Sequence, residues 1–280
     1  MSRRLLICTD LDRTLLPNGE QPESPRARER FAAIAARPEV GLAYVTGRHR
    51  TLVEDAIEAF GLPQPDYVIG DVGTTIYRIR PNGEWEPWED WFEAIAPDWD
   101  GLDRQQIEDI IGDIDKLRLQ EPPKQNRFKI SYYAPAETEA ARVIEEASRR
   151  LDAHRARCNL IWSLDETVPV GLLDVLPASA SKLHAIEFLI RREGFAPEET
   201  VFAGDSGNDL QVLCSPIPSV LVANAAPEVK LEATALAERN GTRDALYLAQ
   251  GGFLGMNGNY SAGILEGIAH FNRGTLSWWS

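Results

Sequence analysis

The sequence predicts an α/β fold in which a parallel sheet is covered by helices and interrupted by a smaller α+β insertion. Short apolar runs alternate with segments of helical periodicity over the first 70 residues and again after residue 170, the order typical of strand-helix-strand units. Between these regions the chain changes character, because four of its seven tryptophans fall between Trp85 and Trp99. We therefore expect a core domain of residues 1–79 and 170–280, with a second domain, residues 80–169, inserted into it.

The composition is that of an ordinary globular protein. Of 280 residues, 44% are hydrophobic and 26% are charged, which suits one large domain or two moderate ones. Lysine and arginine total 29 against 43 aspartates and glutamates, a net charge of −14. This charge argues against a nucleic acid or an anionic membrane as partner. A phosphorylated substrate stays compatible, because a locally bound cation can reverse the field of one cleft.

The cysteines and the apolar segments predict a soluble, cytoplasmic protein. Cys8, Cys158 and Cys214 are odd in number, far apart, and without the paired spacing of a zinc site. The N-terminal apolar run is too short for a signal peptide, and no apolar segment approaches 18 residues.

Each half of the predicted core alternates strands with helices, which predicts parallel pairing with right-handed crossovers. The expected strands are residues 5–8, 40–45, 67–69, 170–176, 200–203 and 219–223. The expected helices are residues 26–36, 51–60, 183–192 and 210–214, one from Pro227, and one within 259–271. In the insertion we expect helices over 102–117 and 137–151, and strands over 128–133 and 158–162. The tryptophans there have two interpretations, packing of a thin second core or a surface on which sugars stack.

Asp10 and Asp12 follow the first apolar strand directly, at the kind of strand end where open α/β sheets bind ligands. Side chains two apart on an extended chain point the same way, so the two carboxylates are expected to converge. At about 4 Å they would repel by roughly 4 kcal/mol at an effective dielectric near 20. A bound cation or a raised pKa on one carboxyl group would relieve this repulsion, whereas the alternative role for the pair is to cap the following turn.

Further candidate residues come where other core strands are expected to end. Thr46 follows the second strand, Lys182 follows strand 170–176, and Asp205 and Asp209 follow strand 200–203. By itself Lys182 could be a surface lysine, but at a helix start it is better explained by a neighbouring anion. An oxygen-rich set with few histidines or cysteines favours Mg²⁺ over Zn²⁺. The sequence excludes an EF-hand, since Leu15 stands where the calcium loop needs glycine, and it contains no P-loop.

Carboxylates, a hydroxyl and a lysine around one metal are the groups that phosphoryl transfer requires, because the charge on three phosphoryl oxygens must be neutralised. One carboxylate can attack phosphorus and form an aspartyl-phosphate. Another can protonate the leaving oxygen and then activate water.

The ordered motifs resemble those of the haloacid dehalogenase-like phosphohydrolases. They are Asp10-Leu-Asp12-Arg-Thr14, Thr46-Gly47-Arg48, Lys182 and Gly204-Asp205-Ser206-Gly207-Asn208-Asp209. The resemblance implies a Rossmann-like parallel-sheet core with an inserted C2-type cap that sets substrate specificity. Within that superfamily the chain is most similar to the sucrose-phosphate phosphatases. The residues that carry this closer similarity are Val72-Gly73-Thr74, Gln125-Asn126 with Lys129-Ile130-Ser131-Tyr132, and Ala262-Gly263-Ile264-Leu265-Glu266 with Ala269-His270-Phe271.

The resemblance implies a role for each motif residue. Asp10 would be the nucleophile and Asp12 the general acid and base, with Thr46 and Lys182 binding phosphate. Mg²⁺ would be held by the Asp10 carboxylate, the Asp12 backbone carbonyl and Asp205, with Asp209 in or just behind the coordination sphere. The candidate substrate-binding residues are Thr46, Gly47, Arg48, Gln125, Asn126, Lys129, Lys182 and Asn208, with Ser206 assisting. Lys129 could instead be a surface residue, and Arg48 could instead structure its loop.

Sucrose 6-phosphate is the substrate that the resemblance favours, with a possible association with a sugar-phosphate synthase. Three departures from the sucrose-phosphate phosphatases concern selectivity: Arg13 where that group often has Asn or Gly, Thr75 where it has Glu, and Leu183 where it has Gly. The alternatives are a mannosylfructose, glucosylglycerol or trehalose type of phosphate, a phosphomutase, and a non-catalytic module that binds a synthase. We interpret the four histidines, His49, His154, His184 and His270, as structural or surface residues.

Overall fold

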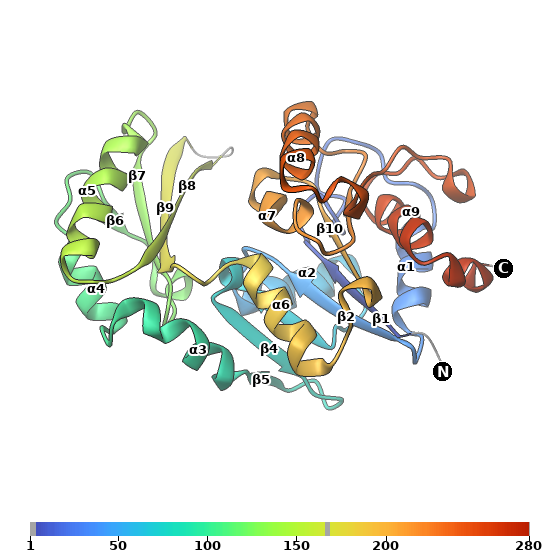
Figure 1. The fold of residues 1–280 in the computed structure, drawn as a ribbon, viewed down its shortest axis with the longest axis horizontal. Helices are drawn as coiled ribbons and strands as arrows, with labels where there is room; N and C mark the ends of the chain where they lie inside the picture. Colours follow the sequence, from blue (N-terminus) through green and yellow to red (C-terminus); the bar gives the residue numbers. More distant parts are fainter. Residues whose placement is uncertain (1–3, 166–168, 280) are drawn as a thin grey trace. The chain divides into compact units, whose positions relative to one another are not determined.

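The computed structural model describes residues 4–165 and 169–279, and these form two compact units (Figure 1). One unit runs up to Pro87 and resumes at Lys182, and the other is Trp88–Ser181. Both junctions lie later in the chain than the expected ones at residues 80 and 170. Each unit has its own sheet, and each is described by itself.

The first unit is built on an eight-stranded sheet whose parallel part carries the predicted core strands. In spatial order its strands are β12 (Leu246–Leu248), β11 (Ser219–Leu221), β10 (Thr200–Gly204), β1 (Leu5–Thr9), β2 (Val40–Val45), β3 (Tyr67–Gly70), β4 (Thr75–Ile79) and β5 (Trp85–Pro87). Pairing is parallel from β12 to β3 and antiparallel from β3 to β5. The antiparallel edge and β12 were not expected from the sequence.

Helices cover both faces of this sheet because its strands are apolar on both sides. The helices are α1 (Ala27–Ala35), α2 (Arg50–Phe60), α6 (Lys182–Glu193), α7 (Leu210–Leu213), α8 (Pro227–Asn240) and α9 (Ser261–Phe271). Apolar side chains of α1, α2 and α9 share one core cluster with alternate residues of β1 such as Leu5 and Ile7. Helices α1 and α9 therefore lie side by side although they come from opposite ends of the chain (Figure 1).

The second unit is an antiparallel sheet with helices, as expected for an α+β insertion. Its strand order is β6 (Arg118–Leu119), β7 (Ile130–Pro135), β9 (Val170–Pro177) and β8 (Cys158–Asp165), and its helices are α3 (Glu89–Ile95), α4 (Arg104–Ile111) and α5 (Ala140–Ala153). The prediction that residues 170–176 form a core strand is wrong, because β9 pairs with β7 and β8. The helix expected over 102–117 stops at Ile111, where Gly112 is its C-cap.

Two of the four tryptophans pack in the core of the second unit, which agrees for them with one of the two interpretations proposed. Trp91 and Trp99 are buried in the second unit, and Trp99 packs against Phe128 with 5.4 Å between the ring centroids. Trp85 is buried too, but on β5 of the first unit. Among the helices that the structure describes, none has the length and hydropathy needed to cross a membrane.

Candidate active site

Three neighbouring strands of the first sheet end where the candidate residues begin. Strands β10, β1 and β2 are adjacent and parallel, so their carboxyl ends meet at one edge. Asp205 follows β10, Asp10 follows β1 and Thr46 follows β2. The sequence suggested that Lys182 follows a strand of this sheet. That prediction is wrong, because the strand before it, β9, belongs to the other sheet. Lys182 enters instead as the first residue of α6.

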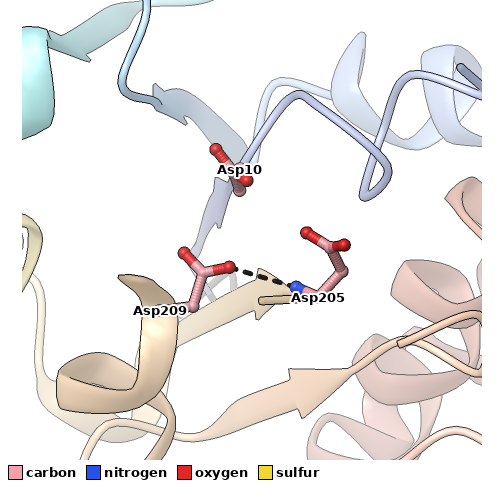
Figure 2. Close-up of side chains that lie close together, drawn as sticks. All are labelled: Asp10, Asp205 and Asp209. Carbon is pink, nitrogen blue, oxygen red and sulfur yellow. Dashed lines mark hydrogen bonds between the residues drawn. The ribbon is translucent and has the colours of Figure 1, made fainter. Parts of the chain in front are cut away.

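Asp10, Asp205 and Asp209 form a buried acidic cluster, with one carboxylate oxygen of each lying within 4.8 Å of the others. Figure 2 shows the three side chains directed into the same space, from the ends of β1 and β10 and from the turn after β10. Three oxyanions this close need positive charge between or beside them. Part of this positive charge comes from the ammonium group of Lys182.

The ammonium group of Lys182 lies between two members of the acidic cluster. Its Nζ is 2.7 Å from Asp209 Oδ1 and 3.1 Å from Asp10 Oδ1, and it also donates to Asn208 Oδ1 at 3.4 Å. Burial lowers the pKa of Lys182, but the two carboxylates outweigh burial and raise it overall. Lys182 is therefore a fixed positive charge beside Asp10.

One ammonium does not neutralise the acidic cluster, because its three carboxylates carry three negative charges when they are ionised. Burial raises the pKa of Asp10, and the charges of Asp209 and Asp205 raise it further, although Lys182 acts in the opposite direction. Burial and Asp209 likewise raise the pKa of Asp205 to about 6. The cluster is thus short of positive charge, which is the electrostatic condition that favours binding of a cation.

Asp209 differs from the other two aspartates because its oxygens are already engaged. Its Oδ2 accepts hydrogen bonds from the backbone N–H groups of Asp205 (3.1 Å) and Ser206 (3.2 Å), and its Oδ1 accepts from Lys182. The close approach requires Gly204, since a Cβ there would lie 2.6 Å from the Asp209 carboxyl carbon. Asp209 therefore fixes the turn that carries Asp205.

Asp12 does not converge with Asp10 in the way that the alternation of an extended strand suggested. Strand β1 ends at Thr9, so the alternation no longer holds at Asp12. Its carboxylate is instead held by Arg48, with Nε–Oδ2 at 2.8 Å and Nη2–Oδ1 at 2.6 Å, and it accepts from Asn18 Nδ2 at 2.8 Å. Burial acts to raise the pKa of Asp12, but the hydrogen bonds and charge of Arg48 lower it overall.

The turn after β2 carries the phosphate-binding candidates Thr46 and Gly47 next to Arg48, the partner of Asp12. Thr46 is buried, and its hydroxyl oxygen accepts a hydrogen bond from the Arg48 N–H at 3.2 Å. Gly47 lies between them. Arg48 thus structures its own loop, one of the two roles considered for it, while its guanidinium holds Asp12. Asn208 accepts hydrogen bonds from Lys182 and from the Ser206 hydroxyl.

Four residues at this edge were given no role from the sequence. Thr14 donates its hydroxyl to Asp205 Oδ1 at 3.2 Å, and the guanidinium of Arg13 lies 3.6 Å from Asp205 Oδ2. Asn18 holds Asp12, and Asn224 donates to the Arg13 carbonyl at 2.6 Å. Thr14 and Arg13 belong to the first motif and could have been considered, whereas no local pattern marks Asn18 or Asn224.

The cap candidates lie in the second unit and make contacts inside it. The side-chain amide of Gln125 donates to the backbone carbonyls of Gln120 and Ser131 and accepts from the Ser131 N–H. The Asn126 side chain accepts from the Phe128 N–H. Lys129 is buried, with its Nζ 3.9 Å from Asp174 Oδ1. The surface interpretation of Lys129 is therefore wrong.

Among the residues that the structure describes, the acidic cluster is the one group with metal-ligand geometry, and it contains no histidine. Cys8, Cys158 and Cys214 are unpaired thiols, as expected.

Comparison with known proteins places this geometry in a family. The family model described as sucrose-6F-phosphate phosphohydrolase matches residues 3–272. A HAD-like hydrolase of Nitrosococcus oceani is 53% identical over 278 residues, which cover 99% of this chain and 74% of that protein. The structure of the sucrose-phosphatase from Synechocystis sp. PCC6803, in complex with sucrose and phosphate, is similar with a TM-score of 0.74 and 29% identity, covering 96% of this chain and 98% of that one.

Other curated relatives differ in their named substrates and in length. Mannosylfructose-phosphate phosphatase of Agrobacterium fabrum is 28% identical over 95% of this chain and 96% of its own length. Sucrose-phosphatase 1 of Nicotiana tabacum is 29% identical, but the chain spans 60% of that protein. Glucosylglycerol-phosphate synthase of Pseudomonas anguilliseptica is 29% identical over 82% of this chain, which corresponds to 27% of the synthase.

Proposed function

Since the chain belongs to the sucrose-6F-phosphate phosphohydrolase family, within the HAD-like phosphatases, we propose that it is a Mg²⁺-dependent phosphatase of sucrose 6-phosphate. The observation that carries the proposal is the buried cluster of Asp10, Asp205 and Asp209, with the ammonium of Lys182 between Asp10 and Asp209. In the proposed reaction Asp10 would be the nucleophile, Lys182 a phosphate-binding cation and the aspartates hard oxygen ligands, all at one sheet edge.

The donor set fits Mg²⁺, because this ion prefers oxygen ligands and the cluster is short of positive charge. The residues that would hold it are the Asp10 carboxylate, the Asp12 backbone carbonyl and Asp205, with Asp209 behind them since its own oxygens are engaged. When bound, Mg²⁺ neutralises part of the charge on the phosphoryl oxygens.

In the proposed reaction an oxygen of the Asp10 carboxylate attacks phosphorus while the bond from phosphorus to the sugar oxygen breaks. Asp12 in its protonated form gives its proton to that oxygen, which leaves as the sugar hydroxyl. Asp12, then ionised, takes a proton from a water molecule that attacks the aspartyl-phosphate, and orthophosphate and free Asp10 result. Thr46 and Lys182 would bind the phosphoryl oxygens, and the ammonium of Lys182 already lies beside Asp10.

We assign substrate selection to the second unit as a cap, with Gln125, Asn126 and Lys129 as candidate sugar contacts. In the described contacts Gln125 and Asn126 support the backbone around β7, so their effect on a sugar would come through the shape of that segment. A mannosylfructose type of phosphate is the second candidate substrate, favoured by similarity to a phosphatase of that name over nearly its whole length.

Association with a sugar-phosphate synthase is supported by one relative. A glucosylglycerol-phosphate synthase contains a segment similar to 82% of this chain within a much longer protein. Such an arrangement indicates that a phosphatase-like chain can be joined to a synthase. The matching test is co-purification of this chain with a sugar-phosphate synthase from the same cell.

The proposed activity is tested by release of orthophosphate from a panel of sugar phosphates, with Mg²⁺ or with EDTA. Sucrose 6-phosphate is expected to be the best substrate of the panel. The alternative substrates to be compared are mannosylfructose phosphate, glucosylglycerol phosphate and trehalose 6-phosphate. Asp10→Asn should abolish release, whereas Asp244→Asn, an exposed aspartate of the same unit, should not change it. Isomerised sugar phosphate without free phosphate would identify a mutase instead, and normal turnover by Asp10→Asn would exclude the mechanism.

A further inference from the structure

Arg13 has a backbone conformation that few arginines adopt, and its neighbours hold it there. Its φ of 57° lies in the left-handed region, which glycine and asparagine occupy more easily than other residues. The Arg13 N–H donates to Asn18 Oδ1 at 2.8 Å, and its carbonyl accepts from Asn224 Nδ2 at 2.6 Å. The backbone of Arg13 is therefore held on both sides of the residue.

The guanidinium of Arg13 lies at the edge of the acidic cluster, beside Asp205. Arg13 Nε lies 3.6 Å from Asp205 Oδ2, and it is buried without a hydrogen-bond partner among the described residues. The other Asp205 oxygen already accepts from the Thr14 hydroxyl. Since 3.6 Å is longer than a hydrogen bond, the contact of Arg13 with Asp205 is an attraction between charges.

This guanidinium changes the charge that a cation would meet. When all three aspartates are ionised, the cluster with Lys182 carries a charge of −2, and Arg13 reduces it to −1. A guanidinium does not lose its proton in a protein, so this charge cannot be removed by titration. Arg48 does not contribute in the same way, because Asp12 neutralises it.

We propose that Arg13 is a resident cation of Asp205 that competes with the divalent metal ion and weakens its binding. The inference rests on the proposed function, since that function supplies the metal. A magnesium ion bound at about 2.1 Å to Oδ2 of Asp205, the oxygen nearest Arg13, would lie no more than about 6 Å from Arg13 Nε. At that distance a single positive charge weakens binding of a divalent ion about tenfold, even at the dielectric constant of water.

The test measures metal affinity directly, by titrating the EDTA-treated full chain with Mg²⁺ in a calorimeter and with Mn²⁺ by electron paramagnetic resonance. Arg13→Asn suits the left-handed backbone and removes the charge, so it should bind Mg²⁺ about tenfold more tightly. Arg13→Lys keeps the charge and should bind like the original chain. The matched control is Arg26→Asn, because Arg26 also has a positive φ, 62°, and pairs with a carboxylate, that of Glu29, on an exposed surface.

The outcomes separate this inference from the proposed function. If the original chain binds Mg²⁺ and releases phosphate from a sugar phosphate, but Arg13→Asn binds Mg²⁺ equally or more weakly, the inference is wrong and the proposed function stands. If neither protein binds a divalent ion, the magnesium site fails and the inference fails with it. Should Arg13→Asn not fold, Arg13→Gln provides the same loss of charge, and unchanged affinity there would equally overturn the inference.

Discussion

Arg48 holds both oxygens of the Asp12 carboxylate, through Nε at 2.8 Å and Nη2 at 2.6 Å. A two-point contact of this kind fixes the plane of the carboxylate as well as its position. Because Arg48 lowers the pKa of Asp12, it favours the ionised form, which activates water in the second half of the proposed reaction, over the protonated form that the first half uses. Arg48 is thus a positioning residue that acts through Asp12.

Replacement of Arg48 should therefore reduce kcat more than it changes KM. We expect Arg48→Ala to lower kcat about 10- to 100-fold, and Arg48→Lys to lower it too, because one ammonium cannot reproduce the two-point contact. The structural effect should be small, within about 1 kcal/mol, since the pair is partly exposed. Steady-state kinetics measures the effect on kcat, and unfolding in urea measures the effect on stability. A change confined to KM would assign Arg48 to substrate binding instead.

Removal of the Lys182 ammonium should destabilise the protein as well as stop the reaction. Lys182→Met leaves Asp10 and Asp209 buried without their common partner, and such a loss costs about 3–5 kcal/mol. Urea unfolding followed by circular dichroism in EDTA measures this cost. Lys116→Met, at an exposed lysine of the second unit, should unfold like the original chain. An equal midpoint for the two variants would show that Lys182 is not what compensates the acidic cluster.

Without metal, the protein should become less stable as the pH rises from about 4 to 6. Asp205 has its pKa raised to about 6 from an unfolded value of 3.8, so between these values the folded state binds more protons than the unfolded state. Its contribution is present below the unfolded pKa and is lost as the pH rises through the folded one. The loss amounts to about 3 kcal/mol.

Asp205→Asn should reduce the loss of stability between pH 4 and 6. Melting the variant and the original chain side by side in EDTA shows how much of that loss is due to Asp205. The Asp12 contribution has the opposite sign, because its folded pKa is lowered, and it is lost only as the pH falls below about 4. Thermal melts across this range therefore distinguish the two aspartates. Identical slopes for the original chain and Asp205→Asn would contradict the assignment.

In the second unit, Asp98 fixes the segment that leads out of the unit toward α6. It is buried, and its carboxylate accepts from the backbone N–H of Ser179 at 2.6 Å and pairs with Arg157. Asp98→Asn removes the charge of that acceptor and should destabilise the unit by about 2–3 kcal/mol. Hydrogen exchange of β8 and β9 measures this locally. Asp100→Asn removes an exposed carboxylate paired with Arg155 and should leave the exchange unchanged.

The sequence predicted elements well wherever a local signal decides them. The strand expected at residues 5–8 became β1 and the run at Val40–Val45 became β2, and Gly61 ends α2 with a φ of 59°, where other residues are strained. It failed for β9, because an apolar strand has the same pattern in any sheet. It also failed for Asp12, because the pattern does not show that the extended strand stops at Thr9.

By itself the sequence determined which chemical groups follow the core strands, namely the carboxylates of Asp10 and Asp205 and the hydroxyl of Thr46, and that the ammonium of Lys182 stands at a helix start. These follow from residue type and local order, which a linear chain displays completely. Only the tertiary structure decided the partners, which put Lys182 between Asp10 and Asp209, Arg48 on Asp12, and Arg13 beside Asp205. Partners such as Lys182 and Asp10 lie far apart in sequence, so their distances depend on strand order, on the point where each strand ends and on helix packing, none of which a local pattern contains.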